Sequence, residues 1–289
     1  MKTLLFPFAA ALALAACSSS KVDFQIDNPT SAPVSIELDG KTVQVPAQQA
    51  QPVTLAAGEH HLRSERLGDV RFIVYADSRG GLINPTLSEY VTANEIYLTG
   101  PDKAKNFGTI KARIALNGVT FEGPFAQTHD LFIDKDWTFG VREPFPEQQV
   151  VAHVDPNGGK IDRKIFTAPD FIAYVENGMG QPGAFKRERP GGYVTPHFAL
   201  EKAPAALPAL DPAYEAHAGP LRDLYARHLR ATSADAQRAL RKEAFQAQMA
   251  FAAATATLGA SLPPSANAAY NTFVTAFGEL TARSALVVP

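Results

Sequence analysis

The chain has 289 residues, 46% of them hydrophobic, and its 27 basic and 29 acidic side chains leave a formal net charge of −2. A net charge this close to zero does not suggest binding to nucleic acid or to anionic lipid, and no nucleic acid is expected as a partner. The single cysteine excludes an intramolecular disulfide, and core packing must therefore hold the fold together. The length allows two or three domains.

Residues 1–16 have the pattern of a secretory signal peptide. Lys2 supplies one positive charge, and the run from 4 to 16 carries none. Such a run is too short to span a bilayer, which takes about 20 residues, but it suits the apolar segment of a signal peptide. The run ends in Leu14-Ala15-Ala16-Cys17, and three serines follow.

This ending resembles the lipobox of bacterial lipoproteins, in which a peptidase cuts before the cysteine and the cysteine is acylated. The resemblance implies that Cys17 is the first mature residue and carries palmitate or a similar acyl chain. Ser18 and Ser19 stand where such proteins carry an inner-membrane retention signal, an aspartate, which implies the periplasmic face of the outer membrane. The alternative is an ordinary Ala-x-Ala cleavage site with an incidental cysteine.

Residues 17–100 are predicted to form a β-sandwich-like module. Val22, Phe24 and Ile26 alternate with polar residues, as in a half-buried antiparallel strand. A second alternating run leads into Asp39-Gly40, the pair that a two-residue type I′ hairpin favours. This hairpin and the following "VTLAAGEHHL" resemble β-sandwich repeats of the PEGA type. Such modules serve mostly as spacers or adhesive elements, so the resemblance implies no catalysis.

Residues 101–200 are predicted to form a second β-rich region with one short helix. Asn117-Gly118 predicts another hairpin, and a helix is expected after Thr167, which can cap it, up to Asn177-Gly178. A possible polar cluster lies between them: His129, Asp130, Asp134 and Asp136. These residues are interpreted either as a carboxylate site or as the solvent-facing side of a strand.

Residues 201–211 form a proline-rich linker, and residues 212–289 are predicted to form a three-helix antiparallel bundle. The helices are expected at about 212–230, at 233–259 and from 263, with the last two forming a hairpin and the first packed against it. The apolar stripe of the first helix includes His228. That of the second consists of Ala236, Leu240, Ala244, Ala247, Phe251, Ala254 and Leu258.

A possible basic patch lies near the junction of the first two helices: Arg222, Arg227, Arg230, Arg238 and Arg241. It could meet phosphate groups or an acidic partner, but the interleaved acidic residues also fit an exposed charged helix end. His60 and His61 are adjacent on a strand and face opposite sides, so no metal is expected there, and no cofactor is expected elsewhere.

The fold class predicted is therefore α+β, a β-sandwich-like region followed by helices. No G-x-S-x-G or H-E-x-x-H motif occurs. The first hypothesis is a lipid-anchored, non-enzymatic envelope protein that serves a structural role or binds a protein partner. The alternative is a periplasmic hydrolase that acts on envelope polymers, with a site at the β/helical junction. A cavity that joined His129 or His153 to Asp130, Asp134 or Asp136 would favour the enzyme.

Overall fold

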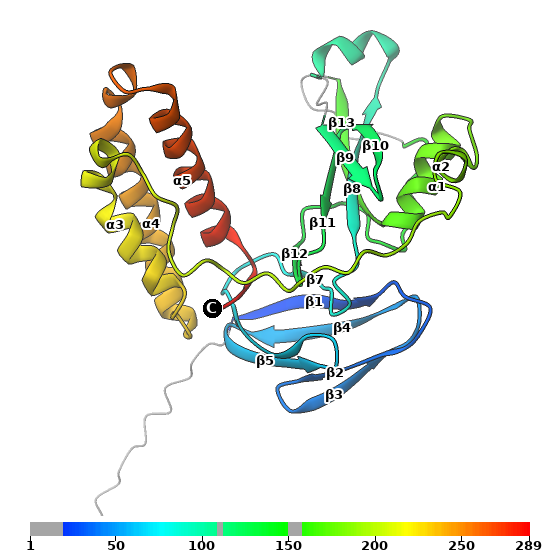
Figure 1. The fold of residues 1–289 in the computed structure, drawn as a ribbon, viewed down its shortest axis with the longest axis horizontal. Helices are drawn as coiled ribbons and strands as arrows, with labels where there is room; N and C mark the ends of the chain where they lie inside the picture. The colour runs from blue at the N-terminus through cyan, green and yellow to red at the C-terminus, as the bar shows by residue number, and fades with distance from the viewer. Residues whose placement is uncertain (1–19, 109–111, 150–157) are drawn as a thin grey trace, which may run out of the picture.

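A computed structural model describes residues 20–108, 112–149 and 158–289. The predicted signal peptide, Cys17 and His153 lie outside these ranges. The architecture is mixed α+β, with antiparallel sheets in the N-terminal part and helices in the C-terminal part, which confirms the predicted class. In Figure 1 the C-terminal helices and the second β-rich region extend from opposite ends of the N-terminal sheets and point away from each other.

Two sheets face each other at the base of the molecule, with strand orders β12-β7-β1-β4 and β14-β6-β5-β2-β3. The strands are β1 (Lys21–Asn28), β2 (Val34–Leu38), β3 (Lys41–Val45), β4 (Gln49–Ala56), β5 (Gly58–Ser64), β6 (Gly68–Val74), β7 (Gly81–Ile83), β12 (Phe132–Asp134) and β14 (Ala285–Val287). Phe24 and Ile26 of the first sheet share one buried core with Leu62 and Phe72 of the second. The two sheets therefore form a sandwich, in which only the β1–β7 pair is parallel among the described strands.

Both predicted hairpins are confirmed. Asp39 and Gly40 have φ of 50° and 76°, and they join β2 to β3. Asn117 and Gly118 have φ of 46° and 90° and join the next such pair. Positive φ at both central positions defines the type I′ turn, which matches the twist of the flanking strands.

The sandwich includes strands from far along the chain. Strand β12 pairs with β7, and β14, close to residue 289, pairs with β6. Conversely, β8 (Tyr90–Leu98) lies before residue 100 but pairs with strands of the second β-rich region. The units of packing are therefore not continuous stretches of sequence.

The second β-rich region has a sheet of order β11-β8-β13 and the β9-β10 hairpin. Its other elements are η1 (Pro101–Asn106), β9 (Ala112–Leu116), β10 (Val119–Gly123), β11 (Phe125–Thr128), β13 (Gly159–Thr167), α1 (Ala168–Gly178) and α2 (Ala184–Glu188). Thr167 caps α1 by accepting a hydrogen bond from the Asp170 N–H, as predicted. Two short helices occur where one was expected, because Glu176 accepts hydrogen bonds from the N–H groups of Gly183 and Phe185 and so holds the turn that begins α2.

A buried ion pair fastens the second region to the sandwich. Asp27 on β1 is completely buried. Its carboxylate pairs with Arg142 and accepts a hydrogen bond from the Tyr90 hydroxyl at 2.5 Å. Residues of β1, of β8 and of the loop before β13 therefore meet at one carboxylate.

The C-terminal helices are α3 (Pro212–His228), α4 (Ala234–Thr255) and α5 (Pro264–Ala282), with a short 3-10 turn, η2 (Leu258–Ala260), between the last two. Helix α3 packs most extensively against α4, whereas the sequence pattern predicted a hairpin of α4 and α5 with α3 packed against it. Phe251 of α4 stacks on Tyr270 of α5, with the ring centroids 5.4 Å apart. Among the helices that the structure describes, none combines the length and apolar character needed to cross a membrane.

The proline-rich segment before α3 crosses the sandwich (Figure 1) and is attached to it. The Ala203 N–H donates to the Val287 carbonyl at 2.8 Å. Phe198 packs against the sandwich core, and Leu207 is buried in the core of the helical part. The segment is therefore anchored at two points before α3, at Ala203 and at Leu207.

Candidate functional site at the junction of the sandwich and the helices

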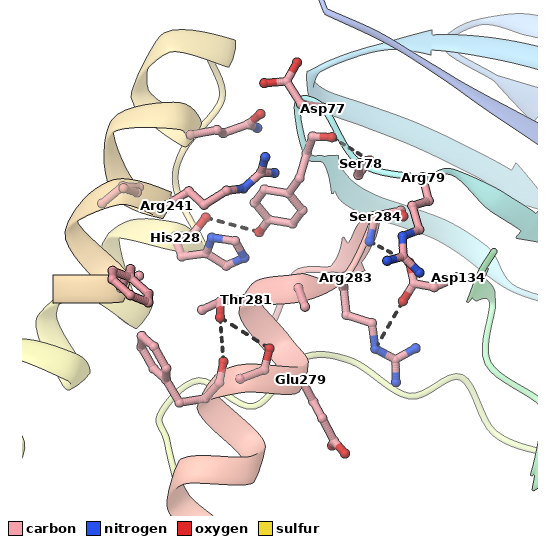
Figure 2. Close-up of a pocket in the computed structure, with 18 of the residues that line it drawn as sticks. Asp77, Ser78, Arg79, Asp134, His228, Arg241, Glu279, Thr281, Arg283 and Ser284 are labelled. Atoms are coloured by element: carbon pink, nitrogen blue, oxygen red, sulfur yellow. Dashed lines mark hydrogen bonds and ion pairs between the residues drawn. The ribbon is translucent and has the colours of Figure 1, made fainter. Parts of the chain in front are cut away.

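A cavity of about 790 Å³ lies between the helices and the loops at one end of the sandwich (Figure 2). The sandwich loops supply a mostly charged side: Asp77, Ser78, Arg79, Asp134, Lys135 and Asp136. The helices supply a mostly apolar side: Leu224, Leu240, Ala244, Phe245 and Phe277. A volume of this size is within the range of ligand-binding cavities.

The wall formed by α4 is fixed to the sandwich by a buried amide. Ser233 caps α4, and Gln237 follows one turn later, almost completely buried. Its Oε1 accepts from the Ala76 N–H at 2.7 Å, and its Nε2 donates to the Val74 and Ala231 carbonyls at 3.0 and 2.8 Å. The amide thus continues the hydrogen bonding of β6 into the helix, and the cavity has a rigid side.

His228, the last residue of α3, lies inside the cavity (Figure 2). Its ring stacks on that of Tyr75, with the ring centroids 4.0 Å apart. The Tyr75 hydroxyl donates to the His228 carbonyl at 3.2 Å. Burial lowers the pKa of His228 to about 4, with Arg241 adding to this lowering and the Leu280 carbonyl opposing it. The imidazole is therefore neutral at pH 7. Within the described ranges, its Nε2 is the one buried side-chain nitrogen or oxygen without a hydrogen-bond partner.

The hydroxyl groups around His228 are all committed to backbone carbonyls. Ser78 donates to Tyr75 at 2.7 Å, and Thr281 donates to Phe277 at 2.7 Å. Ser284 donates to Gly80 at 3.2 Å. In the described part of the chain, no hydrogen bond joins the His228 ring to any of these three hydroxyls.

The predicted polar cluster is only partly brought together. Asp130 and Asp134 lie 2.9 and 3.7 Å from the guanidinium of Arg283, and Asp136 pairs with Arg163 on β13. His129 instead stacks on Phe198, with ring centroids 3.8 Å apart. The junction cavity contains Asp134 and Asp136 but not His129. Its histidine is His228, which the sequence pattern indicated only as part of an apolar stripe.

The five arginines of the predicted basic patch have partners within the chain. Arg238 pairs with Asp77, and Arg241 donates to the Ala76 carbonyl, so these two hold α4 to the sandwich. The others bind elements of the helical part: Arg222 to Glu215, Arg227 to Asp223 and Glu243, and Arg230 to the Ala226 carbonyl. The hydrogen bond from Arg238 also holds the pKa of Asp77 at about 2.

Two other cations remain at the rim of the cavity. Arg79 and Lys135 are exposed, and their side chains form no ion pair in the described ranges. The carboxylates of Asp77, Asp134 and Asp136 are neutralised by arginines, which leaves Glu279 as the one lining carboxylate without such a partner. The rim of the described structure therefore presents two cations without ion-pair partners, Arg79 and Lys135, beside an apolar wall.

The described residues contain no group of three histidine, cysteine, aspartate or glutamate side chains placed to hold a metal ion. Comparisons of the chain with family models, with curated proteins and with solved structures find no match. The interpretation of the site therefore rests on its geometry.

Proposed function

We propose that the chain is a lipid-anchored cell-envelope protein that binds a protein partner at the periplasmic face of the outer membrane. The lipobox-like ending at Cys17 supports the anchor. The binding role rests on one observation, an apolar cavity wall beside two rim cations that have no ion-pair partner in the described structure.

The outer face of α4 extends the apolar wall into solvent. Phe245 and Met249 are one helical turn apart and are 61% and 55% exposed. Exposed apolar side chains that adjoin a cavity are typical of protein-binding surfaces. The partner segment that fits carries apolar side chains for this face and carboxylates for Arg79 and Lys135. In this proposal α3, α4 and α5 act as a three-helix antiparallel bundle that presents the face.

The anchor is tested by metabolic labelling with a palmitate analogue. The wild-type protein is expected to incorporate the label and to sediment with outer-membrane vesicles, whereas the Cys17→Ala variant is expected to do neither. An unlabelled wild-type protein would contradict the anchor.

The docking surface is tested by placing a photo-crosslinking amino acid at position 245 in intact cells. A matched position is Val194, which is 56% exposed but lies outside the helical part. A discrete adduct is expected from position 245 only, and it should weaken when Arg79 and Lys135 are both changed to glutamate. Identical adducts from both positions, or an adduct that ignores the charge reversal, would count against this surface.

A hydrolase remains the second candidate because the cavity lies at the β/helical junction and contains a histidine with an unpartnered nitrogen. Two features weigh against it. The lowered pKa makes His228 a weak base, and each nearby hydroxyl donates to a carbonyl. Turnover of envelope polymers by the wild type that is lost in His228→Phe would reverse this ranking.

A further inference from the structure

A second cavity, of about 920 Å³, lies in the other β-rich region, away from the junction. It is lined by residues of β8, β10, α1 and α2, together with Phe125 and residues 145–147. Six aromatic side chains line it: Tyr97, Phe121, Phe125, Phe145, Tyr174 and Phe185. Ile96 and Met179 add exposed apolar surface, at 39% and 56%.

The charged groups that line this cavity are all negative. They are Glu95, Glu122, Glu147, Glu176 and Glu188, and no lysine, arginine or histidine joins them in the described lining. Glu122 pairs with Arg113 on the neighbouring strand. Glu147 and Glu188 are exposed and have no ion-pair or hydrogen-bond partner in the described ranges. The cavity therefore has uncompensated negative charge.

The inner carboxylates are held in place by the fold. Glu95 is half-buried and accepts the hydroxyl hydrogen of Tyr174. Burial, together with this carboxylate, raises the pKa of Tyr174, so the phenol stays protonated and keeps donating. Glu176 accepts two backbone hydrogen bonds at 2.7 and 2.8 Å. Negative charge is thus fixed beside the aromatic walls.

The aromatic rings are packed against one another and leave part of their surface in the cavity. Phe145 lies 5.9 Å from Tyr174 and 6.4 Å from Tyr97, between ring centroids. Phe121 stacks on Phe185 at 6.2 Å with an interplanar angle of 13°. Ring faces attract cations through their quadrupoles, and the attraction strengthens where water is excluded. Rings and carboxylates therefore select for the same charge.

We propose that this cavity binds a small organic cation, with an ammonium group carried on an apolar skeleton. The carboxylates and ring faces recognise the charge, and the phenylalanine walls recognise the skeleton. The volume accommodates a molecule of drug-like size. A bare metal ion does not fit, because no three carboxylates are placed to ligate one in the described structure.

The proposal is tested by calorimetric titration of the full-length protein with choline and with benzyltrimethylammonium. The neutral control is 3,3-dimethyl-1-butanol, in which carbon replaces the nitrogen of choline. We expect both cations to bind, benzyltrimethylammonium more tightly than choline. The neutral isostere should bind at least about tenfold more weakly than choline does. Equal affinity for choline and its isostere would overturn the proposal, as would no binding of either cation.

Rim variants locate the binding. Changing Glu147 and Glu188 to glutamine should weaken cation binding about threefold or more, and more at low salt than at high salt. The matched control changes Glu37 and Glu65, which are exposed on the sandwich, and should leave affinity unchanged. Phe145→Leu keeps an apolar side chain but removes an aromatic ring. It should weaken the binding of the cation but not that of the neutral isostere. Equal effects of the rim and control variants would overturn the assignment.

Discussion

His228 and Tyr75 form a stacked pair whose burial favours the neutral imidazole. An unfolded histidine has a pKa of about 6.5, and in the fold burial lowers it to about 4. Between these values the unfolded chain binds a proton that the folded chain does not. The free energy of unfolding should therefore decrease as the pH falls below 6.5. The full decrease, on the order of 3 kcal/mol, is reached below pH 4.

His228→Phe tests this linkage because phenylalanine keeps a ring against Tyr75 and does not titrate. Between pH 7 and pH 5 the wild type should lose about 2 kcal/mol more unfolding free energy than the variant does. Urea unfolding at the two pH values measures this difference. The carboxylates are the same in both proteins, so their contribution to the pH dependence cancels in the comparison. Parallel losses in the two proteins would show that His228 does not titrate in this range.

Asp27 is a carboxylate whose burial depends on its partners. It is completely buried and pairs with Arg142, with Tyr90 donating a hydrogen bond. Arg142→Leu should lower the unfolding free energy by about 3 kcal/mol, because an uncompensated charge remains in the interior. Denaturant unfolding measures the loss.

The matched control for this change is Arg113→Leu. Arg113 pairs with Glu122 at the surface, and exposed pairs contribute about 0–1 kcal/mol. Adding Asp27→Asn to Arg142→Leu should recover part of the lost stability, since the neutral amide needs no counterion. A double variant less stable than Arg142→Leu alone would contradict this account.

At the scale of elements, Gln237 decides how α4 is attached. Gln237→Leu keeps a side chain of similar size but removes the amide that pairs with the Ala76 N–H and the Val74 carbonyl inside the molecule. The expected loss is about 2–4 kcal/mol. Thermal unfolding gives the stability, and amide exchange at Ala76 should accelerate. Gln246→Leu, at an exposed position of the same helix, is the control and should change stability little.

This helix also shows how far sequence reasoning reaches. The predicted stripe includes Leu240 and Phe251, which are buried, but Ala236 and Ala254 are exposed. Their neighbours Gln237 and Thr255 are buried instead. Periodicity measures hydrophobicity, and it cannot register a polar side chain whose hydrogen bonds are satisfied by a distant strand or by its own backbone.

Local signals succeeded where the interactions that fix a conformation are local. The two hairpins and the cap of α1 depend on residues within a few positions, and all three were predicted. The junction cavity depends on contacts such as Tyr75 with His228, which are 153 positions apart. The sequence pattern predicted that His228 lies on a buried stripe, but it contained no signal that Tyr75 is its stacking partner. It also had no signal for the pairing of Asp130 and Asp134 with Arg283.

At the scale of the whole molecule, β14 joins two cores. Ala285 and Val287 belong to the core of the sandwich, and Leu286 and Val288 belong to the core of the helices. Val287→Asp should lower the unfolding free energy by about 3 kcal/mol or more, because an unpaired carboxylate would enter the sandwich. Pro289→Asp, at an exposed position, should have little effect.

Near-ultraviolet and far-ultraviolet signals should report a single coincident transition for Val287→Asp, since both cores share the strand. Separate transitions for strands and helices would show that β14 does not couple them.

The place of β14 in the first sheets also constrains how the protein is made. Strand β6 emerges from the ribosome long before residues 285–287, its neighbour in the sheet. Until those residues arrive, the edge of β6 is open, and an open edge invites pairing with other chains. The first sheets are therefore complete only when β14 has docked on β6, and until then this edge is prone to aggregation.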